Sequence, residues 1–101
     1  MSQTYKKLIL DYCAQRSISV PVGFGRNTPS RYAVVRTDQA PPKLVATTWF
    51  KQEDVAYYFE HVLVPQVGSE VASTIPVLDF KEGRRLRFAG STRFATDGSF
   101  S

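Results

Sequence analysis

The stretch Ile75–Phe88, IPVLDFKEGRRLRF, constrains the fold more narrowly than any other part of the sequence. Two runs rich in apolar residues flank Lys81-Glu82-Gly83. A three-residue hairpin loop favours glycine at its last position, where the backbone takes a positive φ. Such a loop pairs Asp79 with Arg85 as an ion pair on the solvent face and leaves apolar residues on the other face. This stretch therefore predicts an antiparallel hairpin that turns at Gly83.

Other runs have the composition or alternation of β-strands. Arg31–Arg36 holds four apolar residues between two arginines, and Lys43–Trp49 is rich in β-branched and aromatic residues. Ser17–Val22 alternates, with its apolar side chains on one face. After the hairpin, Arg93–Ala95 predicts a short last strand, and residues 96–101 are expected to fray.

Two segments repeat apolar residues at the spacing of a helix. They are Tyr5–Gln15 and Gln52–Val64, and the second opens with two acidic residues, which the helix dipole favours there. Pro65 predicts the end of that helix, because proline fits poorly in a helix interior. The predicted order is α-β-β-β-α-β-β. We therefore expect residues 1–101 to form a single α+β domain, with two helices packed on one face of a mainly antiparallel sheet.

Composition narrows the functional class. The chain has 101 residues, of which 43% are apolar, so it is long enough for one folded domain. No apolar run reaches the roughly 18 residues of a membrane-spanning helix, and the N-terminus lacks the pattern of a signal peptide. A single cysteine, Cys13, and a single histidine, His61, make neither a disulfide nor a recognised metal site. We expect a cytoplasmic protein with no cofactor and no membrane association.

The net charge of +4 is unevenly distributed along the chain. Residues 1–50 carry seven basic and two acidic side chains, residues 51–80 carry one and five, and residues 81–101 carry five and two. The middle segment, which includes the second helix, is therefore acidic, and both flanks are basic. Any nucleic acid is expected to meet the hairpin or the first loop and not the second helix.

The densest basic cluster lies in the C-terminal hairpin. Arg85, Arg87 and Arg93 stand near aromatic residues in the sequence, and a positive ribbon with aromatics can follow a phosphate backbone. Phe24 and Arg26, in the loop over residues 23–30, form a second candidate binding tip. The alternative is a solvated edge hairpin whose charges deter aggregation between strands.

Several apolar residues do not fit a two-layer monomer. Some lie off the apolar stripe of their helix, and Lys43–Trp49 is apolar on both faces. A contiguous set of exposed apolar residues marks a contact surface. The pattern therefore predicts a symmetric homodimer or a protein partner. The residues expected at that interface are Leu10, Tyr57, Val64, Val45 and Trp49.

The first 65 residues, in the order α-β-β-β-α, are similar to the double-stranded-RNA-binding domain. Tyr5–Tyr12 looks like that family's first helix, and Pro21 falls where its first strand begins. The family binds phosphates through a lysine-rich start of its second helix, whereas this chain has Lys51-Gln52-Glu53-Asp54 there. Two acids remove the charge that such binding needs, so the resemblance implies a fold and not a function.

No catalytic motif stands out, so the sequence favours a small non-catalytic binding protein that associates with itself. One alternative is a nucleic-acid-binding protein that uses the Arg84–Arg93 hairpin. Another is a small ligand-binding or enzymatic domain with a pocket between helix and sheet near His61, where histidine would act as a general base. The polar residues that would line such a pocket are His61, Asp54, Tyr57, Tyr58 and Arg36.

Overall fold

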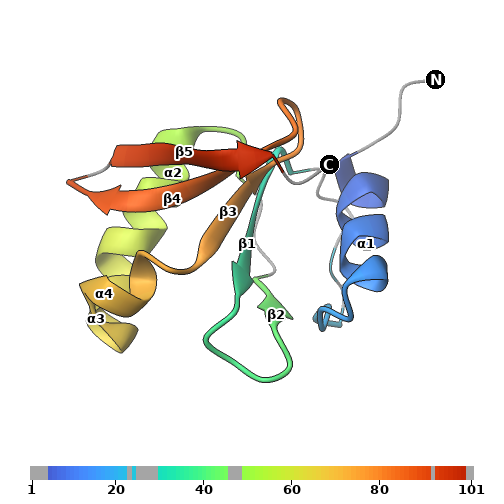
Figure 1. Ribbon diagram of the computed structural model, residues 1–101, viewed down its shortest axis with the longest axis horizontal. Helices are drawn as coiled ribbons and strands as arrows, with labels where there is room; N and C mark the ends of the chain where they lie inside the picture. The colour runs from blue at the N-terminus through green and yellow to red at the C-terminus, as the bar shows by residue number, and fades with distance from the viewer. Residues whose placement is uncertain (1–4, 23, 25–29, 46–48, 92, 100–101) are drawn as a thin grey trace.

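The computed structural model describes residues 5–22, 24, 30–45, 49–91 and 93–99, and it has the predicted α+β class (Figure 1). Neighbouring strands pair antiparallel in a five-stranded sheet of order β2-β1-β3-β4-β5. The first helix and the strands are α1 (Tyr5–Gln15), β1 (Tyr32–Arg36), β2 (Lys43–Leu44), β3 (Pro76–Asp79), β4 (Arg84–Gly90) and β5 (Arg93–Ser99).

The second helical region is longer than predicted. It consists of α2 (Gln52–Tyr58), a π-helical turn η1 (Phe59–Leu63) and α3 (Val64–Val67), and after Gly68 it is followed by the short α4 (Ser69–Ala72).

The prediction that the second helix ends at Pro65 is wrong, because the widened turn before it accommodates the proline. The N–H of Val64 donates to the carbonyl oxygen of Phe59, five residues back. Proline has no N–H to donate and its ring needs room in the preceding turn, which a π-turn supplies. The helix ends instead at Gly68, whose φ of 88° suits a helix end.

The two long helical regions cover opposite faces of the sheet. In β1, Tyr32 and Val34 belong to the core beneath α2, whereas Ala33 and Val35 belong to the core beneath α1. Figure 1 shows α1 on one side of β1 and α2 on the other. The prediction of two helices on one face is therefore wrong. The physical reason is that β1 is apolar at consecutive positions, so both of its faces need cover.

The first predicted strand and the predicted frayed end also differ from the structure. Within Ser17–Val22 only Ser19 forms a bridge, parallel to Lys43. At the other end β5 runs to Ser99, because the seven residues of β4 provide a pairing partner, with Arg84 opposite Ser99. Residues 100–101 lie outside the described part of the chain.

The hairpin between β3 and β4 is shifted by one residue from the predicted register. Gly83 has the predicted positive φ, at 67°, but Asp79 pairs with Arg84 and not with Arg85. The loop holds four residues, because the carboxylate of Asp79 accepts hydrogen bonds from the N–H groups of Lys81 and Glu82. The shift takes Asp79 away from the solvent face.

Candidate binding face

Strands β4 and β5 are covered on one face only. Leu86 and Phe88 are buried in the core beneath α2, where the ring of Phe59 lies 5.0 Å from that of Phe88 and 5.7 Å from that of Phe94. On the opposite face α1 packs on β1, β2 and β3: of the described residues, those buried beneath α1 include none from β4 or β5. Figure 1 shows α1 at a distance from both strands. One half of this sheet face is therefore open.

The three arginines predicted to bind come together on the open face. Arg85 and Arg87 alternate with the buried residues of β4, and Arg87 pairs with Ala95 of β5. Strand alternation places Arg93 on the same face as Ala95. These side chains therefore share one surface, which we call the open face. It is formed by the outward-pointing side chains of Arg85, Arg87, Arg93, Ala95 and Asp97.

The open face carries a net positive charge. Arg85 donates to the carbonyl oxygen of Asp97 at 3.1 Å, and its guanidinium lies 3.5 Å from the carboxylate of the same residue. No carboxylate of the described residues forms an ion pair with Arg87 or Arg93. Three positive charges stand against one negative charge, so the face has a net charge of +2. The guanidinium groups of Arg87 and Arg93 are available to an anion.

Two shallow hollows adjoin Arg87. One, of about 280 Å³, is also lined by Arg85, Ser73 and Thr74, and the other, of about 370 Å³, shares Ser73 and Arg87 and extends to the end of β4. The hydroxyl groups of Ser73 and Thr74 already donate to the carbonyl oxygens of Glu70 and Val71, at 2.7 and 2.6 Å. A hydroxyl has one hydrogen to donate, so the arginines are the main donors to an anion in these hollows.

The aromatic residues near the arginines do not lie on the open face. Phe88 and Phe94 pack edge to face with each other, 5.5 Å apart, and both contact Phe59 in the core. The arginines and the aromatic rings therefore lie on opposite faces of the hairpin, because side chains alternate along a strand. Phe24 packs against the core beneath α1, and Arg26 lies outside the described residues.

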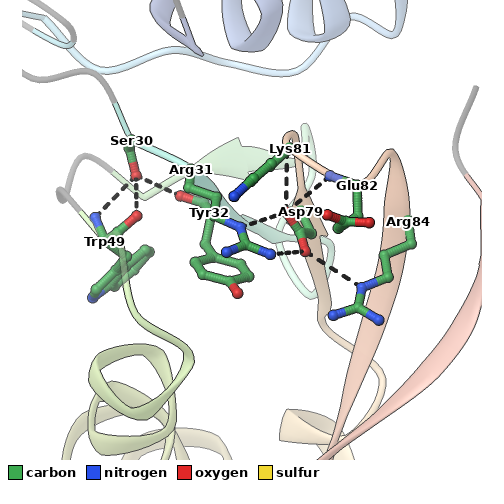
Figure 2. Close-up of polar contacts among 8 residues, drawn as sticks. All are labelled: Ser30, Arg31, Tyr32, Trp49, Asp79, Lys81, Glu82 and Arg84. Atoms are coloured by element: carbon green, nitrogen blue, oxygen red, sulfur yellow. Dashed lines mark hydrogen bonds and ion pairs between the residues drawn. The ribbon is translucent and has the colours of Figure 1, made fainter.

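The predicted solvent-exposed pair between Asp79 and Arg85 is replaced by a buried carboxylate with other partners (Figure 2). Asp79 is 0% exposed. Arg31 donates to its two carboxylate oxygens, each at 2.9 Å, and Arg84 donates at 3.3 Å. The sequence signal for this cluster is one acidic residue within an otherwise apolar strand. Because Arg31 and Arg84 are engaged there, the cluster holds the end of the sheet together.

The pKa of Asp79 is set by opposing effects. Burial would raise it, but hydrogen bonds from Arg31 and from the N–H groups of Glu82 and Lys81, with the charge of Arg31, lower the pKa below its ordinary value. Asp79 is therefore ionised at neutral pH, and the buried charge has its partners. Every buried side-chain nitrogen and oxygen among the described residues likewise has a hydrogen-bond partner.

Most residues predicted at a dimer interface contribute to the fold of the single chain. Trp49 is only 4% exposed, and Val45 and Val64 pack against the same core beneath α2. Leu10 is half-buried on α1, and Tyr57 is 64% exposed. These five residues therefore do not form one exposed apolar surface, because the helices on both faces of the sheet cover most of them.

Ser30 connects Trp49 to the start of β1 through hydrogen bonds, as Figure 2 shows. Its hydroxyl accepts the N–H of Trp49 at 2.9 Å and donates to the carbonyl oxygen of Tyr32 at 2.6 Å.

The residues expected around a pocket near His61 do not converge on one. The exposed ring of His61 lies against the ring of Tyr57, with 4.1 Å between their centroids. His61 lines neither of the two hollows beside Arg87 nor a third one beside β2. Tyr58 and Arg36 line the third, of about 330 Å³, beside β2. The described residues hold no group of three side chains suited to a metal ion.

Comparisons with known proteins add no family. In the described chain the first expected strand is a single bridge, so the α-β-β-β-α order behind the resemblance to the double-stranded-RNA-binding domain is not reproduced. Among the described residues, none of the helices has the length and apolar composition of a membrane-spanning segment. The chain matches no protein-family model, no curated protein and no solved structure.

Proposed function

We propose that the protein is a non-catalytic binding protein whose open face holds the phosphate backbone of a nucleic acid. The observation that carries this proposal is the convergence of Arg85, Arg87 and Arg93 on a part of the described sheet that α1 leaves uncovered. Two of these arginines lack an ion pair with any described residue. Guanidinium groups bind phosphate oxygens through two parallel hydrogen bonds, which suits such a ligand.

The geometry favours contact with the backbone and not with the bases. Arg85 and Arg87 stand two residues apart, which is about 6.7 Å along a strand, so they can reach successive phosphates of an extended chain. Phe88 and Phe94 are turned into the core, so neither offers a surface on which a base could stack. Contacts to phosphates position a protein without reading sequence. We therefore expect weak binding that depends on salt and not on sequence.

The other side of the molecule disfavours the same ligand. The helical region over the opposite face carries Glu53, Asp54, Glu60 and Glu70. A polyanion is repelled there and attracted at the open face, so it has one orientation on the molecule. This charge separation is the pattern that the sequence predicted for its acidic middle segment.

The test is fluorescence anisotropy with a labelled single-stranded oligonucleotide, between about 50 and 200 mM salt. We expect log K to fall with log salt with a slope of about −2, as three phosphate contacts with a single strand require. Arg87→Ala should reduce that slope by about 0.7 in magnitude. Arg16→Ala, which removes the same charge from the end of α1, is the matched control and should leave the slope nearly unchanged.

Two outcomes would overturn the proposal. One is an equal loss of binding in Arg87→Ala and Arg16→Ala, which would mean attraction by net charge alone. The other is binding of a polyglutamate peptide as tightly as the oligonucleotide at the same salt, which would point to an acidic protein partner.

A further inference from the structure

The two edges of the sheet differ in how they are protected. The β2 edge is two residues long, and the chain at Ser19 lies along it: the N–H of Ser19 donates to Pro42 at 2.8 Å, and the N–H of Leu44 donates to Ser19 at 2.9 Å. The β5 edge is seven residues long, and no strand of the described residues lies on its outer side. An uncovered edge strand is a template for pairing with another chain.

Strand β5 lacks two of the residue types that most often keep edge strands from pairing. Arg93–Ser99 contains neither lysine nor proline, the residues that commonly block an edge. Its pairing with β4 is irregular at two points, between Phe88 and Gly90 and between Arg84 and Leu86, and near the second point Gly98 has a φ of 92°. The stretch before Gly98, 93–97, lies within the strand and is long enough for a short antiparallel ladder.

We infer that the β5 edge pairs antiparallel with β5 of a second copy of this chain, centred on Ala95. Two copies related by a two-fold axis present the same edge to each other in opposite directions. Centring the pair on Ala95 places Arg93 opposite Asp97 of the second copy, and Asp97 opposite its Arg93. Residues 93, 95 and 97 share one face of the strand, so both ion pairs lie on the open face.

We infer this register because it pairs opposite charges between the two copies and keeps the contact that Asp97 already makes with Arg85. Asp97 is half-exposed and touches Arg85 of its own chain at 3.5 Å, so its carboxylate can accept a second guanidinium. In the dimer, the charges alternate across three strands, from Arg85 to Asp97 to Arg93 of the second copy. A shift by one residue would place Arg93 and Asp97 on opposite faces of the joined sheet and lose both pairs.

The dimer joins two five-stranded sheets and makes the two open faces continuous. Six arginines and two aspartates would then line one surface with a net charge of +4, which strengthens its attraction for a polyanion. The dimer itself does not depend on the proposed binding of nucleic acid. It also differs from the dimer expected from the apolar residues, since it uses the polar edge of the sheet.

The test is sedimentation equilibrium of the whole chain without nucleic acid, over a micromolar to sub-millimolar range. Wild type should shift with concentration from 11.4 kDa toward twice that mass. Arg93→Asp and Asp97→Arg each place like charges opposite each other, and symmetry makes each substitution count twice. Each should weaken the dimer by about tenfold or more, and the double variant, which restores both pairs between the copies but not the contact of Arg85 with Asp97, should recover most of that loss.

Arg87→Ala is the control, because it removes a charge from the open face without touching the edge, and it should leave the dimer intact. Circular dichroism checks that each variant is folded, and if Arg93→Asp fails that check, Asp97→Arg carries the comparison. A monomeric wild type, a double variant that stays monomeric, or single variants as dimeric as wild type would each overturn the inference. Wild type that stays monomeric but binds an extended peptide along β5 would assign the edge to a protein partner.

Discussion

The sheet has two halves that differ in how much of them is covered. Strand β1 is buried on both faces, beneath α2 on one side and α1 on the other, whereas β4 is buried on one face and open on the other. The difference follows from sequence pattern. Consecutive apolar residues in β1 need cover on both faces, and the alternation of arginine with leucine and phenylalanine in β4 needs it on one. The open half is where binding surfaces remain.

The largest expected effect concerns the single covered face of β4 and β5. Phe59 is fully buried and contacts Phe88 and Phe94. Phe59→Ala should lower the free energy of unfolding by about 3–5 kcal/mol, because it removes a large buried ring and leaves a cavity. Urea denaturation measures this, with the half-exposed Phe50→Ala as control. A loss below about 1 kcal/mol would mean that this face does not hold the hairpin.

The next effect concerns Asp79, where the two halves meet. Asp79→Ala should cost about 3 kcal/mol, since Arg31 and Arg84 lose their shared carboxylate while keeping some contact with solvent. Because the folded-state pKa is lowered, the stabilisation by Asp79 is present above the unfolded-state pKa of about 3.9 and is lost as the pH falls through the folded value.

Urea titrations at descending pH check this prediction. The wild-type protein should lose stability in acid more steeply than Asp79→Asn, which has no charge to lose at that position. Equal acid sensitivity of the two proteins would show that other carboxylates dominate.

A smaller effect tests the covered and open faces residue by residue. In β1, Val34→Ala and Val35→Ala should each cost about 2 kcal/mol, although their side chains point in opposite directions. In β4, Leu86→Ala should cost a similar amount, but its neighbour Arg87→Ala should stay within about 0.5 kcal/mol. Thermal and urea unfolding measure all four. A large loss from Arg87→Ala would mean that the open face is covered.

The smallest effect concerns the cover that α1 provides. Burial raises the pKa of the Cys13 thiol to about 11, against a small opposing effect of Arg16. The native thiol should therefore stay protonated at neutral pH and react with a disulfide reagent far more slowly than in urea. Equal rates in the folded and unfolded protein would show that α1 does not close this face. Cys13→Ala should cost only about 1 kcal/mol.

Local features of the fold could be predicted from sequence where a few neighbouring residues decide them. The helix over Tyr5–Gln15 and the glycine turn at Gly83 are confirmed. The hairpin register was missed by one residue, because Asp79 is held by Arg31, which lies far away in the sequence. The helix past Pro65 was missed because a π-turn, which has no simple sequence signal, makes room for the ring.

The candidate site was predictable in its residues and not in its arrangement. Arg85, Arg87 and Arg93 were identified as a basic cluster, and alternation along the strands does place them on one face. Their aromatic neighbours in the sequence, Phe88 and Phe94, lie on the opposite face, in the core beneath α2. Trp49 was expected at an interface and is instead buried within the chain.

By itself, the sequence determined the type of most elements, the α+β class and the charge of the hairpin, because these depend on periodicity and composition within short windows. Tertiary structure alone decided which face each helix covers, which arginines pair with Asp79 and which edge of the sheet stays open. These features depend on contacts between residues far apart in the chain, such as that of Arg31 with Asp79. Patterns within a short window of sequence do not predict the energies of such contacts.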